Sequence, residues 1–237
     1  MSAFVLAQAR WPAVEEGPRR LLVVPVGSLE QHGPHLPLDT DTRIAVAVAR
    51  RACAGRDGVA LAPALPVGAS GEHADFPGTL SVGTAALTAC LTELGRHASL
   101  HWPAMLLVNG HGGNLDAVGT AVRRLRAEGR ACGAWHAGLP GGDAHAGRSE
   151  TSLMLALAPR AVCLAAAARG DARPVGELMA ALRARGVRAV SPNGVLGDPA
   201  GASAAEGEAL LARLVSGLNG AIGQMLADAG GTDRRGT

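Results

Sequence analysis

Residues 21–41 read LLVVPVGSLEQHGPHLPLDTD, an apolar run followed directly by a cluster of polar side chains. A continuous apolar run of this length is typical of a strand that is buried on both faces. The segment after it, residues 30–41, holds three carboxylates and two imidazoles. In extended backbone Glu30 and His32 would point to one face, about 7 Å apart. That spacing suits two neighbouring metal ions better than one.

Asp41 closes this segment and opens the next element. It follows Thr40, the expected N-cap, and precedes a helical pattern over 43–54. Its carboxylate would therefore lie in the first turn of a helix whose N-terminus faces back toward the strand end. One carboxylate in that position could bridge two ions.

Short apolar runs alternate with longer helical patterns along the rest of the chain. We expect strands at 21–26, 59–65, 105–108 and 131–136, and helices at 43–54, 83–99, 115–128, 151–158, 175–185 and 203–228. This alternation predicts an α/β fold, a three-layer α/β/α sandwich with a mainly parallel sheet. Residues 1–229 are expected to form a single catalytic domain, followed by a flexible C-terminal tail at 230–237.

Composition excludes several classes of function. The formal charge of +2 is too small to indicate a nucleic-acid partner, and all 22 basic residues are arginine, which excludes Schiff-base lysines and a P-loop lysine. No apolar run is long enough for a membrane span, and the N-terminal residues do not resemble a signal peptide. The four cysteines form no C-x-x-C pair, which is typical of reduced thiols. We expect a cytoplasmic protein.

Two later loops carry further metal-binding side chains. Residues 108–114 read VNGHGGN, whose glycines would let a strand end present His111, although an exposed histidine in a plain turn is the alternative. Glu150 begins a helical pattern, where a simple dipole-favoured cap is the alternative. The mixed nitrogen and oxygen set suits zinc, manganese or iron(II). The candidate metal ligands are Glu30, His32, Asp41, His111 and Glu150.

Two such ions would activate water for hydrolysis of a carbonyl–nitrogen bond. The leaving nitrogen needs a proton, and His145, in a glycine-rich loop that we expect to be flexible, is the candidate shuttle beside Glu150. A further polar stretch at 68–79 could line a substrate pocket or contact another subunit, and a purely structural role is equally compatible. Its candidate substrate-binding residues are Ser70, Glu72 and His73.

Four motifs together resemble the creatininase (creatinine amidohydrolase) family. They are EQHGPHLPLDTD at 30–41, FPGT at 76–79, NGHGGN at 109–114 and HAGRSETS at 145–152. The resemblance runs from about residue 11 to about residue 226. It implies a creatininase-like fold, a symmetric homo-oligomer of six or more subunits, and two divalent metal ions per subunit. In family terms Glu30, Asp41 and His111 would bind one ion, and His32, Asp41 and Glu150 the other.

One departure bears on the substrate. Family members that act on creatinine carry a glutamate where this chain has Gly113, which argues against creatinine. Residues 141–155 and 190–199 instead resemble a peptidase branch that removes a modified C-terminal Val-Tyr unit from a small ribosomal precursor peptide. Arg148, where other branches often have an acid, could hold a peptide carbonyl or acidic group, or simply pair with a nearby carboxylate. The alternatives are a cyclic-amide or formamide hydrolase of the same family and a non-catalytic metal-binding scaffold.

Overall fold

Five parallel strands form the centre of the computed structural model, which describes residues 2–139 and 141–232. Their spatial order is β1 (Phe4–Val5), β3 (Val59–Leu61), β2 (Leu21–Val26), β4 (Ala104–Asn109) and β5 (Ala131–His136). Each neighbouring pair is parallel. The predicted parallel sheet is confirmed, with β1 as an edge strand that the sequence pattern did not predict.

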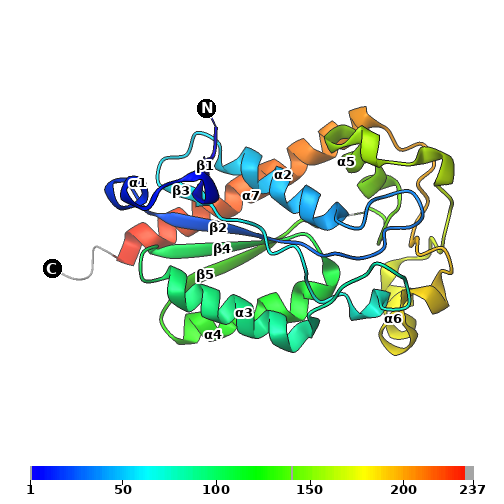
Figure 1. Cartoon of the computed structure of the whole chain (residues 1–237), viewed down its shortest axis with the longest axis horizontal. Coiled ribbons are helices and arrows are strands. Elements are labelled where there is room, and N and C mark those ends of the chain that lie inside the picture. The colour runs from blue at the N-terminus through cyan, green and yellow to red at the C-terminus, as the bar shows by residue number, and fades with distance from the viewer. Residues whose placement is uncertain (1, 140, 233–237) are drawn as a thin grey trace.

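Helices cover both faces of this sheet (Figure 1). On one face lie α2 (Thr40–Cys53) and α7 (Ala204–Thr232), with α5 (Arg148–Leu157) packed against both. On the other face lie α3 (Gly83–Ala98) and α4 (Leu115–Ala127). The three-layer sandwich predicted from the sequence is therefore confirmed.

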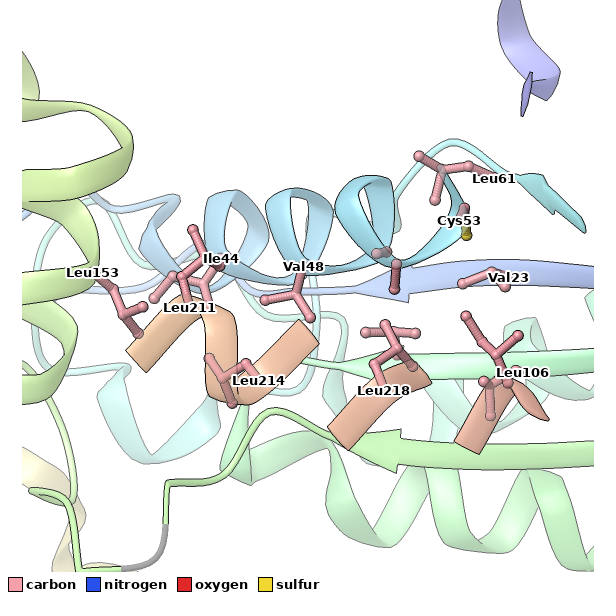
Figure 2. Packing of buried hydrophobic residues seen from close by; sticks show 14 of the residues in the cluster. Val23, Ile44, Val48, Cys53, Leu61, Leu106, Leu153, Leu211, Leu214 and Leu218 are labelled. Atoms are coloured by element: carbon pink, nitrogen blue, oxygen red, sulfur yellow. The ribbon is translucent and has the colours of Figure 1, made fainter. Parts of the chain in front are cut away.

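The alternation of side chains along the strands divides the interior into two cores. In β2, Leu21 and Val23 belong to the core beneath α2 and α7, whereas Leu22 and Val24 belong to the core beneath α3 and α4. Figure 2 shows the first core, where Val48 of α2 and leucines of α7 pack against the sheet. Each fully buried aliphatic side chain stabilises the fold by about 1.5–3 kcal/mol, and the two cores together hold the strands in place.

Several boundaries differ from the predicted ones for identifiable reasons. Strand β3 ends at Leu61 rather than 65, because Pro63 has no N–H to donate to a sheet. Helix α6 (Val175–Val190) continues past residue 185 through a kink at Gly186, whose φ is 74°. Helix α7 continues to Thr232, beyond the expected start of the tail, and residues 233–237 of that tail lie outside the described residues. A short helix, α1 (Trp11–Glu16), was not predicted.

The loops that follow β2, β4 and β5 lie at one edge of the sheet, because parallel strands end on the same side. The buried polar side chains of the candidate metal centre lie at this carboxyl edge of the sheet.

Within the described ranges no helix combines the length and apolar character needed to cross a membrane. All four cysteines are free thiols, with Cys53 and Cys132 buried and Cys90 and Cys163 exposed.

Candidate metal centre

Glu30 and His32 lie in the loop that leaves β2, and both are fully buried. The backbone between them is not the extended strand that we expected, because the loop folds back on itself through bridges from His32 to Pro34 and Leu36. The Nδ1–H of His32 donates to the Glu30 carbonyl at 3.1 Å. This bond leaves Nε2 of His32 to face the carboxylate of Asp41, 3.0 Å from Oδ1.

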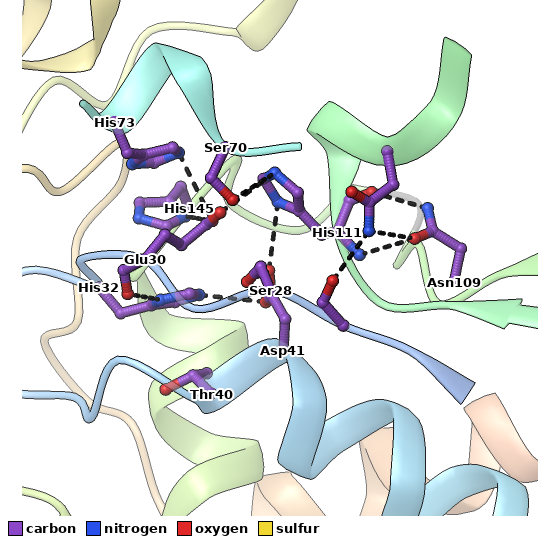
Figure 3. A network of polar contacts seen from close by, with 12 residues as sticks. Ser28, Glu30, His32, Thr40, Asp41, Ser70, His73, Asn109, His111 and His145 are labelled. Atoms are coloured by element: carbon purple, nitrogen blue, oxygen red, sulfur yellow. Dashed lines mark hydrogen bonds and ion pairs between the residues drawn. The ribbon is translucent and has the colours of Figure 1, made fainter. Parts of the chain in front are cut away.

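Asp41 lies in the first turn of α2, as predicted, and its carboxylate meets two imidazoles (Figure 3). Oδ1 faces His32, and Oδ2 lies 3.2 Å from Nδ1 of His111 while accepting a hydrogen bond from Ser28 Oγ at 2.9 Å. The expected N-cap was wrong by one residue. Thr40 is the first helical residue, and its hydroxyl donates to the Pro37 carbonyl at 2.7 Å.

His111 is held by two asparagines at the end of β4. Asn109 Nδ2 donates to the His111 carbonyl at 2.6 Å, and the backbone N–H of His111 donates to Asn109 Oδ1 at 3.3 Å. Asn114 donates from Nδ2 to Asn109 Oδ1 at 3.0 Å and to the Gly27 carbonyl at 2.9 Å. The loop after β4 is thereby tied to the loop after β2. His111 Nε2 consequently lies 3.1 Å from Glu30 Oε2.

His145 is buried at 7% exposure, so the expectation that it lies in a flexible loop was wrong. It forms an antiparallel bridge with Leu196, a residue far away in the sequence. Its Nε2–H donates to the Gln31 carbonyl at 2.8 Å, and Nδ1 lies 3.8 Å from Glu30 Oε1. Burial holds the pKa of His145 well below its usual value, and the neighbouring imidazole of His32 adds to the effect. His145 is therefore neutral, and the lone pair on its Nδ1 faces the cluster.

The five predicted ligands fall into two groups that share one carboxylate. Glu30, Asp41 and His111 form one group, and His32, Asp41 and Glu150 form the other, with donor atoms within 4.8 Å of one another. These are the two sets that the resemblance implied, although ligation itself remains a prediction. A third possible group combines Glu30, His32 and His145.

Electrostatics indicate that this cluster fits divalent cations. Both oxygens of Glu30 are buried without a hydrogen-bond partner, a costly arrangement for a carboxylate unless a cation compensates it. Burial alone would lower the pKa of His32, but the charge and hydrogen bond of Asp41 outweigh it and raise the pKa to about 10. Burial raises the pKa of Glu150 to about 7. Protons therefore compensate the acids here, and metal binding would displace them.

The three polar residues predicted from the stretch at 68–79 contact this cluster. Ser70 Oγ lies 3.5 Å from His111 Nε2, and Glu72 Oε1 lies 3.4 Å from the same atom. His73, at the end of the 3-10 turn Gly71–His73, places Nε2 3.5 Å from Glu30 Oε1. Sequence reasoning missed Gln31, whose amide donates to His73 Nδ1 at 2.8 Å. The one sequence feature that could have indicated Gln31 was its position between the predicted ligands Glu30 and His32.

Arg148 is the first residue of α5, and its guanidinium is engaged away from the imidazoles. Its Nε donates to both carboxylate oxygens of Glu206, at 3.0 and 2.9 Å. This is the carboxylate pairing that the sequence left open, and a role in substrate binding remains a prediction. Glu206 also accepts a hydrogen bond from Ser152 Oγ at 2.9 Å. At the start of α7, Ser203 Oγ accepts the Glu206 N–H at 3.2 Å, which is one of the two hydrogen bonds of a capping box.

A cavity of about 230 Å³ adjoins the cluster between the ends of β4 and β5 and helix α5. His111 and Glu150 contribute to its wall, so a bound molecule would contact two predicted ligands. The rest of the wall combines apolar and polar side chains. Its further side chains include Ile44, Leu115, Leu139, Leu153, His136, Asp143 and Ser149. The stretch at 68–79 contacts the cluster without lining this cavity.

Known proteins share both the sequence and the fold. The mycofactocin precursor peptide peptidase of Mycolicibacterium smegmatis is 50% identical over 217 residues, 89% of this chain and 87% of the relative. The creatinine amidohydrolase of Pseudomonas putida is 34% identical over 174 residues, 61% of this chain and 66% of the relative. A crystal structure of creatinine amidohydrolase (creatininase) superposes with a TM-score of 0.77 at 29% identity, covering 94% of this chain and 98% of that one. A family model described as creatinine amidohydrolase matches residues 7–222, and the chain therefore belongs to the creatininase family.

Proposed function

We propose that this chain is a metal-dependent peptidase that hydrolyses an amide bond near the C-terminus of the modified mycofactocin precursor peptide. The released product would be the C-terminal Val-Tyr-derived unit. The geometric observation that carries the proposal is the pair of ligand groups sharing Asp41, together with the carboxylate of Glu30, which is buried without a hydrogen bond. The peptide substrate is supported by the 50% identity to the mycobacterial peptidase over most of both chains.

Two divalent ions, zinc, iron(II) or manganese, fit the donor set. The structural neighbours include one named "Creatininase Mn" and a creatininase variant of Zn-Zn type, which supports these metals for the family's site. When bound, such ions polarise the scissile carbonyl and activate water for attack. The chain would hold one ion with Glu30 and His111 and the other with His32 and Glu150, with Asp41 between them.

His145 is the proposed proton carrier for the leaving nitrogen. Its Nε2–H is committed to the Gln31 carbonyl, so Nδ1 is the atom that can accept a proton and release it to the amine. Burial keeps the ring neutral, so Nδ1 carries no proton before the reaction. Glu150 is proposed both as a ligand and as a catalytic carboxylate at the mouth of the cavity. Hydrolysis then needs only water, which supplies the hydroxyl to the carbonyl and the proton to the amine.

The substrate-binding surface is proposed to include Ser70, Glu72, His73 and Arg148. Since Glu206 engages the Nε of Arg148, a peptide would have to use the remaining guanidinium nitrogens. An Arg148→Ala variant should raise KM and leave the metal content unchanged. The loss in folding stability should stay below about 1 kcal/mol, because exposed ion pairs contribute little.

A small-molecule amidohydrolase is the second candidate, favoured by the cavity of about 230 Å³ beside His111 and Glu150. A non-catalytic scaffold is disfavoured, because all five donor side chains converge. We further propose a single catalytic domain, a cytoplasmic location and a symmetric homo-oligomer. The exposed Trp11 and Leu100 are compatible with contacts between subunits.

The test is an incubation of metal-loaded protein with the modified precursor peptide or with creatinine, followed by mass spectrometry. We expect a dipeptide-sized product from the peptide, lost after chelation and in a Glu30→Gln variant. A Glu16→Gln variant, changed at an exposed position of α1, is the matched control and should retain activity. Creatinine turnover without peptide cleavage would overturn the proposed substrate.

A further inference from the structure

The Nε2 atom of His111 lies between the Glu30 carboxylate, whose Oε2 is 3.1 Å away, and acceptors from residues 69–72. The Ala69 carbonyl is 3.1 Å away, and Glu72 Oε1 is 3.4 Å away. A carbonyl can only accept, so Nε2 carries the hydrogen that it donates to Ala69. The lone pair of a neutral ring is then on Nδ1, 3.2 Å from Asp41 Oδ2. At this distance either a proton or a metal ion must lie between the lone pair and the carboxylate, and a bound metal ion would displace the proton.

We propose that Glu72 is a positioning residue for His111. With the Ala69 carbonyl it accepts the Nε2–H, so that His111 presents Nδ1 toward Asp41 and a metal ion. Metal-bound histidines commonly donate their other ring N–H to a carboxylate or a backbone carbonyl, which fixes the tautomer and makes the ring a stronger ligand. The inference rests on the metal centre of the proposed function and assigns Glu72 a role beyond contact with substrate.

Gly113 provides an independent observation at the same junction. A Cβ at this position would collide at once with the Ala69 carbonyl oxygen, Glu72 Oε1 and His111 Nε2. The backbone does not demand glycine there, because Gly113 is not among the residues with positive φ. Glycine is therefore needed for space, so that the carboxylate can reach the ring.

The neighbouring Gly112 differs in this respect, since a Cβ there would meet no atom within 4 Å apart from those of its two chain neighbours. The two adjacent glycines therefore form a matched pair, of which only one borders the contact between Glu72 and His111. The acceptor segment is also fixed from the same loop, because the Ala69 N–H donates to Asn114 Oδ1 at 2.8 Å. The backbone that precedes Glu72 is thus tied to the loop that carries His111.

The test compares Glu72→Gln and Gly113→Ala with the controls Glu16→Gln and Gly112→Ala. Zinc affinity is measured by competition with a chromophoric chelator, and a crystal structure of the zinc-loaded parent protein shows which nitrogen of His111 binds. We expect Nδ1 on zinc, and one of the two ions bound about 10- to 100-fold more weakly in both test variants. Both controls should stay within about twofold of the parent affinity, since a Cβ at Gly112 meets neither Glu72 nor Ala69 and Glu16 is exposed on α1.

Zinc on Nε2, or unchanged affinity in the Glu72→Gln variant, would overturn the inference. A lower melting temperature with parental zinc affinity would indicate a merely structural role and would equally overturn it. If Gly113→Ala does not fold, Glu72→Gln carries the test alone, because it keeps the size of the side chain. No readout uses the peptide, so a failure of peptide cleavage is distinguishable from a failure here. A parent protein that binds no zinc, manganese or iron would refute both the proposed function and the role of Glu72.

Discussion

Asp41 is the carboxylate that both predicted ions share. Replacing Asp41 should therefore weaken the binding of both ions, whereas replacing a ligand of one ion should weaken the binding of that ion alone. An ion present at a thousand times its Kd stabilises the fold by about 4 kcal/mol. With an unfolding entropy of roughly 2.1 cal/mol/K per residue, the 237 residues give about 0.5 kcal/mol per degree. Each ion should therefore raise the melting temperature by about 8 °C. Two ions should give about 16 °C in the parent protein.

The assay records melting temperatures of metal-free and metal-loaded protein, with ions per chain from elemental analysis. Glu150→Gln should retain about half of the metal-induced shift, and Asp41→Asn should retain almost none. Asp39→Asn is the control, because Asp39 is two residues away and pairs with Arg43 on the surface. It should keep the full shift. An Asp41→Asn protein with the full shift, or with the same loss as Glu150→Gln, would refute the shared-carboxylate arrangement.

Three further predictions concern protonation and catalysis. A thiol reagent at pH 8 should label Cys90 and Cys163 but not Cys53, whose pKa burial raises to about 12, and labelling of all four thiols in folded protein would contradict this. His145→Asn should lower kcat by about 10²- to 10⁴-fold at unchanged metal content, and a change confined to KM would exclude proton transfer. In metal-free protein the raised pKa of His32 contributes stability that is complete below pH 6.5 and is lost as pH rises through about 10. Melting temperatures of the metal-free protein should fall across this window, less so in His32→Gln, and an equal fall in both would contradict the assignment.

The fold was largely predictable because buried parallel strands carry continuous apolar runs. Residues 21–26 illustrate this, since all six side chains of β2 are buried. Strand β1 escaped prediction because two residues, Phe4 and Val5, are too few to establish a periodicity. Only pairing with β3, far along the chain, makes them a strand.

The site was predictable in its ligand types and less so in its contacts. Glu30 and His111 lie in the loops that follow β2 and β4, and because parallel strands end at the same edge of the sheet, their convergence follows from the fold. The burial of His145 depends on a bridge to Leu196, and the approach of Glu72 to His111 depends on a distant loop. Neither pairing leaves a local pattern, because each is set by tertiary packing and not by sequence spacing.

The most direct test of the metal centre is anomalous diffraction from crystals of the protein loaded with zinc or manganese. The account predicts two ions per chain, about 3.5–4 Å apart, with the Asp41 carboxylate bound to both. One ion should contact Glu30 and His111, and the other His32 and Glu150. A single ion, or two ions that do not share Asp41, would contradict it.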